Sequence, residues 1–177
     1  MIAVGGMGIV LSAQHLQLGE DVAIKVLLPT ELAEEPHAAT RFMREARAAA
    51  CIKSEHVVRI FDVDSLPSEL PYMVMERLIG SDLRALLRAE GPLPIADVVE
   101  YVTLAWDAIG AAHRMGIVHR DLKPSHLFLT RRNDGSPLVK VLDFGISKAF
   151  QQAALEGTLT TSRTLIGSPM YMSPEQI

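Results

Sequence analysis

Two short segments, His119-Arg120-Asp121-Leu122-Lys123-Pro124 and Asp143-Phe144-Gly145, carry most of the information in this chain. Between them lie two apolar runs, at 127–129 and 138–142, which are separated by Asn133-Asp134-Gly135. An Asn, Asp and Gly turn between apolar runs is typical of a β-hairpin. The first polar segment is therefore predicted to precede a hairpin, and the second is predicted to come after it.

The part of the chain before these segments is rich in predicted strands. Short apolar runs between Gly, Pro and polar breaks predict strands at 9–11, 22–27, 57–63 and 71–75. Apolar residues spaced by three and four predict a helix over 38–52. The first 76 residues are therefore expected to form one lobe, made of a small sheet and a helix.

Helical patterns dominate the next part, at 81–89 and 94–115. The longer helix is expected to direct one set of side chains towards a core: Val98, Val99, Val102, Ala105, Trp106, Ile109 and Ala112. Residues 146–168 are rich in Ser and Thr without periodicity, which predicts a surface loop. Residues 77–177 are expected to form a second lobe.

Composition limits the class of protein. The 177 residues are 49% hydrophobic and 21% charged, which is typical of a globular chain and not of a disordered one. The net charge of −4 and the scattered basic residues do not favour a nucleic acid as partner. No apolar run reaches the roughly 18 residues that cross a bilayer, and no signal peptide is recognisable. We expect a cytoplasmic segment without a membrane span.

Cys51 is the only cysteine of the chain. A single cysteine excludes an internal disulfide and therefore a disulfide-stabilised scaffold. Because its neighbours in the predicted helix are Ala48, Ala49, Ala50 and Ile52, we expect Cys51 to be buried as a small hydrophobic residue.

A glycine-rich stretch, Gly5-Gly6-Met7-Gly8-Ile9-Val10, is by itself more typical of an ordinary hairpin turn. Two motifs further along the chain favour a functional interpretation of this stretch. They are Lys25, in a predicted strand, and Ser173-Pro174-Glu175, near the end of the sequence. Together with the two segments at 119–124 and 143–145, these five elements in this order have no ordinary structural explanation. The sequence resembles the protein kinase family, in particular the eukaryotic-like Ser/Thr kinases of bacteria, over its whole length.

The resemblance implies an α+β, bilobal protein-kinase-like fold, with a small antiparallel sheet lobe carrying one helix and an incomplete helical lobe. It also implies transfer of the γ-phosphoryl group of ATP to a Ser or Thr hydroxyl of a protein substrate, with Mg²⁺ as cofactor. The catalytic residues implied are Asp121 as base, Lys123 on the γ-phosphate, Lys25 on the α- and β-phosphates and Glu45 as the partner that orients Lys25.

The same resemblance implies an ATP site. Its members are the glycines Gly5, Gly6 and Gly8 over the triphosphate, Val10 above the adenine, Ala23, the gatekeeper Met75, Glu76 and Leu78 with backbone groups at the adenine edge, Asp82 at the ribose and Phe128 beneath the ring. Ala3 stands where the family has the first glycine of this loop, which predicts a looser hold on the nucleotide.

The metal site departs from the family pattern. Asp143 is expected to bind the magnesium that bridges the phosphates. His126 stands where the family has an asparagine that binds a second magnesium. An imidazole is a poor ligand for Mg²⁺ and suits Mn²⁺ better, so Mn²⁺ is an alternative cofactor.

The resemblance also implies regulation by phosphorylation between Asp143 and Glu175. The expected acceptor is Thr164, with Thr160, Thr161 and Ser162 as alternatives. Three cations, Arg120, Arg41 and Lys148, are expected to meet the phosphate through charge-assisted hydrogen bonds. Ser168 is assigned differently, as a hydrogen-bonding residue directed towards Asp121 and Lys123.

A second interpretation stays open, a catalytically impaired or pseudokinase-like module that binds nucleotide and transfers nothing. His126 favours it, as does the end of the sequence after Glu175, where the family continues with helices. Without those helices, the 94–115 helix is expected to leave apolar surface uncovered. The presence of Lys25, Asp121 and Asp143 favours the enzyme.

Overall fold

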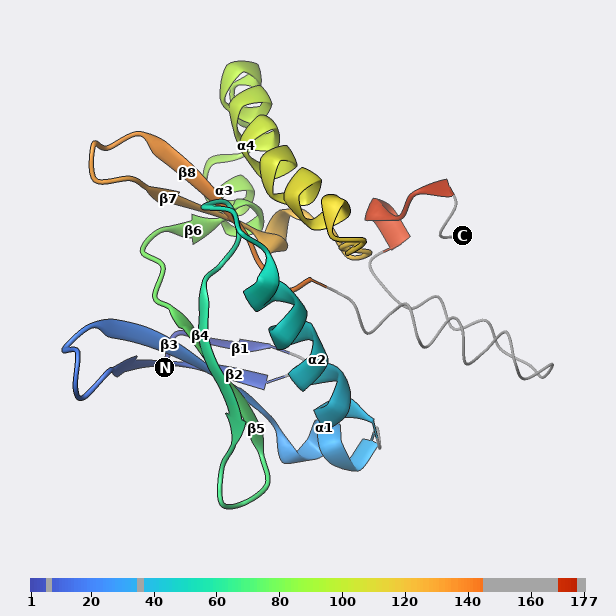
Figure 1. Cartoon of the computed structure of the whole chain (residues 1–177). Helices are drawn as coiled ribbons and strands as arrows, with labels where there is room; N and C mark the ends of the chain where they lie inside the picture. Colours follow the sequence, from blue (N-terminus) through green and yellow to red (C-terminus); the bar gives the residue numbers. More distant parts are fainter. Residues whose placement is uncertain (6–7, 35–36, 145–168, 175–177) are drawn as a thin grey trace.

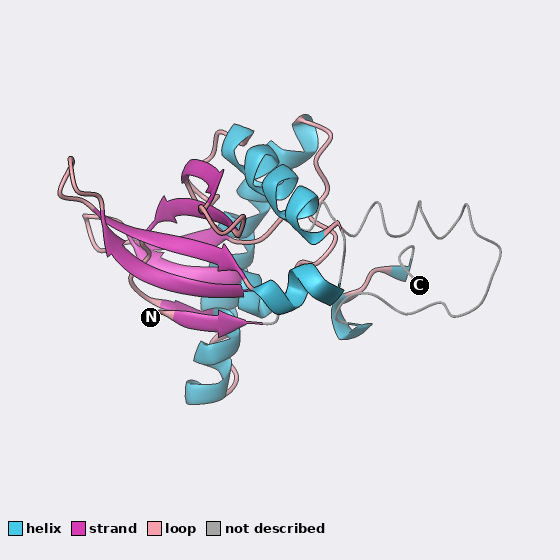
Figure 2. Ribbon diagram, turned by 90° about the horizontal axis from the view of Figure 1, so that it is seen from below, coloured by secondary structure: helices cyan, strands magenta, loops and turns pink. Residues whose placement is uncertain are grey.

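The computed structural model describes the chain except for residues 6–7, 35–36, 145–168 and 175–177. The described residues form two lobes, the first built on a twisted sheet and the second on helices and a β-hairpin (Figure 1). Figure 2 shows the same arrangement from below, with the large sheet beside the helices. No helix among the described residues is both long and apolar enough to span a membrane.

The sheet of the first lobe has five antiparallel strands in the order β1-β2-β3-β5-β4. Their bounds are β1 Ala3–Gly5, β2 Gly8–Gln14, β3 Asp21–Leu27, β4 Ile60–Ser65 and β5 Pro71–Glu76. The predicted strands at 9–11, 22–27 and 71–75 are confirmed. Gly8 is required by close packing, because a Cβ atom there would clash with the carbonyl oxygen of Val26.

The predicted strand at 57–63 is wrong in its first half. The connection 52–59, between α2 and β4, leaves the sheet and bonds to the second lobe: the Val58 N–H donates to the Val141 carbonyl at 3.2 Å. Val57 also forms an isolated parallel bridge with Val141. Because Val57 and Val58 pair with Val141 of the second lobe, they do not extend the strand, and β4 begins only at Ile60.

Two helices accompany the sheet, a short α1 (Pro29–Glu34), which was not predicted, and α2 (Ala38–Cys51), which was. The buried face of α2 consists of Ala38, Phe42, Ala46 and Ala49, at spacings of three and four. Cys51 lies off this face and is exposed, so the prediction of a buried cysteine is wrong.

The second lobe contains α3 (Leu83–Glu90), α4 (Ile95–Arg114) and a small sheet in the order β6-β7-β8. Its strands are β6 Ser81–Asp82, β7 Leu127–Arg131 and β8 Pro137–Val141, and two 3₁₀ turns lie at Pro124–His126 and Pro169–Tyr171. The predicted helices and hairpin are confirmed. Asp82 begins α3, because its carboxylate accepts the Ala85 N–H at 2.9 Å.

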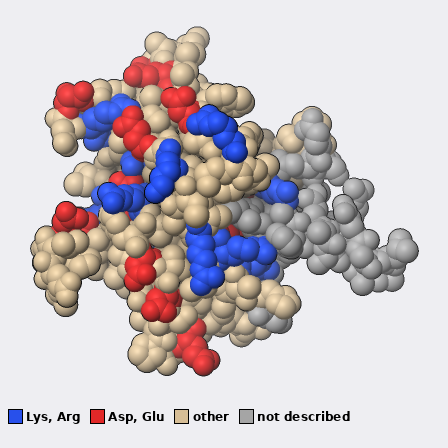
Figure 3. Space-filling view, viewed as in Figure 1, with Lys and Arg blue, Asp and Glu red and all other residues tan. Residues whose placement is uncertain are grey.

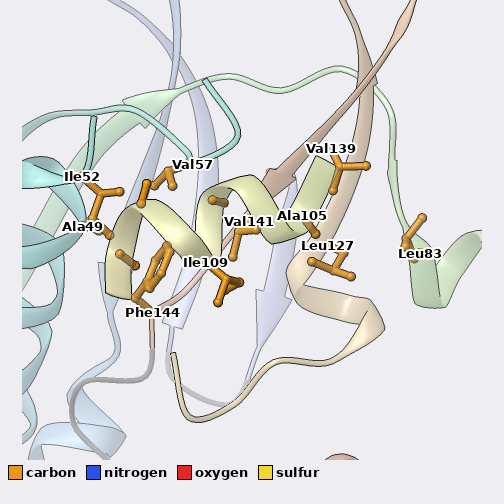
Figure 4. Close-up of a cluster of buried hydrophobic side chains, with 13 residues drawn as sticks. Ala49, Ile52, Val57, Leu83, Ala105, Ile109, Leu127, Val139, Val141 and Phe144 are labelled. Carbon is orange, nitrogen blue, oxygen red and sulfur yellow. The ribbon is translucent and has the colours of Figure 1, made fainter. Parts of the chain in front are cut away.

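The core of the second lobe forms where α4 packs on β8 and on the 52–59 connection (Figure 4). Alanines make most of this contact: Ala105, Ala108 and Ala112 are buried together with Ile109, as is Phe144 from beyond β8. The prediction that Val98, Val99, Val102 and Trp106 face the core is wrong. These four side chains are exposed, that of Trp106 to 68%. α4 is apolar on more than one side, and only the alanine side is covered by the described residues.

Candidate active site

Lys25 and Asp143, which are 118 residues apart in sequence, form an ion pair between the lobes. Lys25 Nζ lies 2.6 Å from Asp143 Oδ1. Lys25 is held in the middle of the sheet, where β3 pairs with both β2 and β5. Asp143 follows two residues after the end of β8. The fold therefore joins two of the residues that the sequence predicted to act together.

The backbone and the charge of Asp143 are both unusual. Its φ angle is +48°, a left-handed conformation that is uncommon for residues other than glycine and occurs often at functional sites. Burial raises the pKa of its carboxyl group, but the charge and hydrogen bond of Lys25, together with His126 and His119, outweigh this effect, and the net pKa is lowered. Its side chain is still 49% exposed, so it can reach a ligand.

Asp121 and Lys123 form the second lysine–carboxylate pair, with 2.9 Å between Lys123 Nζ and Asp121 Oδ2. Both side chains are mostly shielded from water, Asp121 at 11% and Lys123 at 23% exposure. Both lie in the segment between α4 and the 3₁₀ turn that begins at Pro124. An ionised carboxylate beside an ammonium is a suitable proton acceptor next to a site for negative charge.

His119 joins this segment to the one that carries Asp143. Its ring bridges two backbone groups: Nε2 lies 2.9 Å from the Leu142 carbonyl oxygen, and Nδ1 lies 3.3 Å from the Asp121 nitrogen. These contacts require Nε2 to carry the proton and Nδ1 to accept the Asp121 N–H. Burial lowers the pKa of His119 to about 4, so the ring is neutral at pH 7.

His119 makes the stability of the fold depend on pH. Because its folded-state pKa of about 4 lies below the ordinary 6.5, its contribution is complete above pH 6.5 and is lost as pH falls from 6.5 towards 4. The expected loss is about 2 kcal/mol by pH 5. We expect the free energy of unfolding in urea to fall less between pH 7 and 5 in His119→Gln. The exposed His113→Gln is the matched control and should keep the full pH dependence, whereas equal slopes for all three proteins would contradict this role.

His126 lies against Asp121, with 3.8 Å between His126 Nδ1 and Asp121 Oδ2. Burial lowers its pKa, so the neutral ring is favoured. Its Nδ1 atom is buried and has no hydrogen-bond partner in the described structure. A buried nitrogen without a partner is costly unless a ligand satisfies it.

The family resemblance predicts Glu45 as the partner of Lys25. Within the described residues, the ion pair of Lys25 is made with Asp143, and none is formed with Glu45. Glu45 lies close enough to Arg41 to raise the pKa of that guanidinium, although burial lowers it more. The arrangement of Arg41 and Glu45 is the i,i+4 one that α2 provides.

The strand registers bring several predicted nucleotide residues together. Val10 stands opposite Lys25 in the β2–β3 pair, and Ala23 stands opposite Met75 in the β3–β5 pair. In the second lobe, Asp82 stands opposite Phe128. Glu76 ends β5, and Leu78 follows it on the way to β6. These residues therefore come from both lobes.

Several predicted site residues lie outside the described residues, namely Gly6, Lys148, Thr160, Thr161, Ser162, Thr164 and Ser168. Gly5 ends β1 at the edge of this gap. Arg120, by contrast, is described, and its φ angle of +61° is again left-handed. The segment between α4 and the 3₁₀ turn at Pro124 thus holds a strained residue directly before Asp121.

Sequence reasoning missed Lys140, which is buried in β8 and whose Nζ lies 2.6 Å from Glu76 Oε1. A signal was available, because a lysine interrupts the otherwise apolar run 138–142. A charged residue in the middle of a buried strand requires a partner.

Charged residues of both signs are mixed over the face of the molecule in Figure 3, where Lys and Arg are blue and Asp and Glu are red. This mixture does not alter the prediction, drawn from composition, that a nucleic acid is not a partner.

Comparison with known proteins supplies a family. The family described as protein kinase domain matches residues 1–177. The chain is 45% identical over 172 residues to the serine/threonine-protein kinase Pkn1 of Myxococcus xanthus. The alignment covers 97% of this chain and 24% of Pkn1. It is 36% identical over 179 residues to the serine/threonine-protein kinase PknB of Mycobacterium leprae, and this alignment covers 99% of this chain and 28% of PknB. The chain therefore spans about a quarter of the length of these relatives.

Solved structures show the same fold. The PknI kinase domain of Mycobacterium tuberculosis matches with a TM-score of 0.70 and 30% identity, over 82% of this chain and 58% of that one. A variant of the same domain matches with a TM-score of 0.69 and 29% identity. The predicted α+β, two-lobed fold is confirmed.

Proposed function

Because this chain belongs to the protein kinase family, we propose that it provides catalytic residues of a serine/threonine protein kinase, which transfers the γ-phosphoryl group of ATP to a protein hydroxyl. The observation that carries the proposal is the pair of lysine–carboxylate contacts, Lys25 with Asp143 and Lys123 with Asp121. Phosphoryl transfer depends on positioned charges of this kind more than on covalent help from the protein.

In this reaction the oxygen of the substrate hydroxyl bonds to the γ-phosphorus while the bond from that phosphorus to the bridging oxygen of ADP breaks. Asp121 accepts the hydroxyl proton. Lys123, 2.9 Å from the Asp121 carboxylate, offers its charge to the γ-phosphoryl oxygens. Lys25 offers its charge to the α- and β-phosphates.

The nucleotide is proposed to lie between the lobes. Val10 and Ala23 would cover the adenine from the sheet side, beside Met75, and Phe128 would support it from β7. The backbone groups of Glu76 and Leu78 would meet the adenine edge, with Gly5, Gly6 and Gly8 near the triphosphate. Asp82 uses one carboxylate oxygen to begin α3, which leaves the other for the ribose.

A divalent metal ion is implied by the family, and two residues fit it. Asp143 offers a partly exposed carboxylate, and His126 offers the buried Nδ1 atom that has no hydrogen-bond partner. The described residues hold no cluster of three or more His, Cys, Asp or Glu side chains suited to a metal, so phosphate oxygens and water would complete the coordination. When bound, the ion would neutralise charge on the triphosphate.

The nitrogen ligand predicts a preference among metal ions. Mn²⁺ accepts imidazole better than Mg²⁺ does, so activity and nucleotide affinity should be higher with Mn²⁺. His126→Asn should raise the rate with Mg²⁺ by about 5- to 150-fold, equivalent to about 1–3 kcal/mol. Initial rates and nucleotide dissociation constants with each ion measure this preference. The exposed His113→Asn is the control, and an unchanged ratio of the two rates in His126→Asn would remove His126 from the metal site.

Regulation belongs to the same proposal. Phosphorylation of Thr164, or of Thr160 or Thr161, would place negative charge near Arg120, Arg41 and Lys148. The proposed partners are ATP and a protein with a Ser or Thr acceptor, and the proposed compartment is the cytoplasm.

The direct test is transfer of labelled γ-phosphate from ATP to a generic protein substrate, with Mg²⁺ or Mn²⁺, followed by identification of phosphoserine or phosphothreonine. Transfer is expected and would support the enzyme. Binding of ATP without any transfer, under both metal ions, would instead favour a nucleotide-binding signalling module.

A further inference from the structure

Lys140 carries a charge into the interior of the molecule. It lies in β8 between Val139 and Val141, which are completely buried, and is itself only 8% exposed. A buried ammonium is costly unless it is paired and hydrogen-bonded. Lys140 Nζ meets both conditions, since it lies 2.6 Å from Glu76 Oε1 and 3.4 Å from the Val57 carbonyl oxygen.

Glu76 is held by more than this ion pair. Its Oε1 atom also accepts the Arg59 N–H at 2.7 Å, and its own N–H donates to the Arg59 carbonyl at 2.9 Å. The side chain and the backbone of Glu76 therefore both attach the end of β5 to the 52–59 connection.

The 52–59 connection is in turn attached to β8. The Val141 N–H donates to the His56 carbonyl at 2.7 Å, and the Val58 N–H donates to the Val141 carbonyl at 3.2 Å. Figure 4 shows Val57, Val139 and Val141 gathered beside α4. The end of β5, the connection and β8 therefore form a closed set of contacts, with the Lys140–Glu76 ion pair as its charged member.

This set lies between the two ends of the proposed nucleotide site. Lys140 stands opposite Phe128 in the β7–β8 pair, so the two side chains share one face of the hairpin. Glu76 belongs to the proposed adenine edge, and Asp143 comes three residues after Lys140. A change at Lys140 is therefore positioned to move the adenine-binding residues relative to the metal ligand.

We propose that Lys140 is a positioning residue, which holds the end of β5 at a set distance from β8 and thereby sets the affinity for the adenosine part of the nucleotide. This inference rests on the proposed function. Lys140 touches neither the nucleotide nor the substrate in this proposal, and acts through Glu76.

The experiment compares adenosine with inorganic tripolyphosphate plus Mn²⁺, each titrated into the purified protein by calorimetry. In Lys140→Met we expect the adenosine affinity to fall by roughly 3- to 30-fold, while the tripolyphosphate affinity stays within about twofold. Lys140→Arg keeps the charge and should recover most of the adenosine affinity. General damage to the fold would lower both affinities together, which would overturn the proposal.

A control is available in a surface ion pair that joins the same β7–β8 hairpin to the 52–59 connection. Arg132, at the end of the β7–β8 hairpin, pairs with Glu55 of the connection at 2.8 Å on the surface. Arg132→Met should leave the adenosine affinity unchanged, and an equal loss in this variant would overturn the special role of Lys140. If Lys140→Met does not fold, Lys140→Met/Glu76→Gln removes both charges and should show the same loss of adenosine affinity.

The outcomes separate the two proposals. If the unaltered protein binds neither adenosine nor ATP, the proposed function fails. If it binds both, and a folded Lys140 variant binds adenosine as well as the unaltered protein does, only the role of Lys140 fails.

Discussion

Asp121→Asn is expected to lower kcat by about 10²- to 10⁴-fold while leaving the affinity for ATP nearly unchanged. Asparagine has almost the same shape as aspartate but cannot accept the proton of the attacking hydroxyl. The Asp121 side chain is only 11% exposed, so water cannot easily replace it as the proton acceptor. Steady-state kinetics with a generic protein substrate, combined with ATP titration, separate the two quantities.

The control for Asp121 is Asp107→Asn, an exposed aspartate on α4. It changes the net charge by the same amount and should keep full activity. A kcat for Asp121→Asn within about threefold of the unaltered protein would show that another group accepts the proton.

Lys25→Met is expected to lower kcat/KM by about 10²- to 10³-fold, because it removes a charge aimed at the phosphates. The fold should survive, since Lys25 contributes to the sheet through its backbone pairing with Val10 and Met73. Burial raises the pKa of the Asp143 carboxyl group, and Lys25 supplies the main opposing effect, so this pKa should rise when the Lys25 ammonium is removed. The acid limb of the pH–rate profile should then move to higher pH.

Asp143→Asn provides the complementary variant to Lys25→Met. If the two residues act as one unit, the double variant should lose little more activity than either single variant. Lys53→Met, an exposed lysine after α2, is the charge-matched control. A Lys25→Met protein that phosphorylates substrate at the normal rate would remove Lys25 from its assigned role.

Most of the elements could be predicted because their signals are local. The 38–52 pattern and the runs at 22–27 and 71–75 coincide closely with α2, β3 and β5. The strand at 57–63 failed at its start, since Val57 and Val58 pair with Val141 of β8, and contacts with a distant strand leave no periodic signal in these residues.

The sequence singled out the candidate site residues but did not predict how they pair. Lys25, Asp121, Lys123 and Asp143 are set apart by their motifs, and the structure places them in two close pairs. The partner of Lys25 was predicted as Glu45, but the structure forms the pair with Asp143. Ion pairs form over distances of a few ångströms, and sequence spacing does not report such distances across 118 residues.

The sequence by itself determined most of the secondary structure, the order of the motifs and therefore the family, since propensity, periodicity and residue chemistry are properties of short segments. Only the tertiary structure decided which side of α4 is covered, which lysine meets which carboxylate, and that Lys140 is buried against Glu76. A helix that is apolar on several sides, such as α4, offers more than one packing face. The choice among them depends on the shape and charge of the elements that fold against it, and these come from distant parts of the chain.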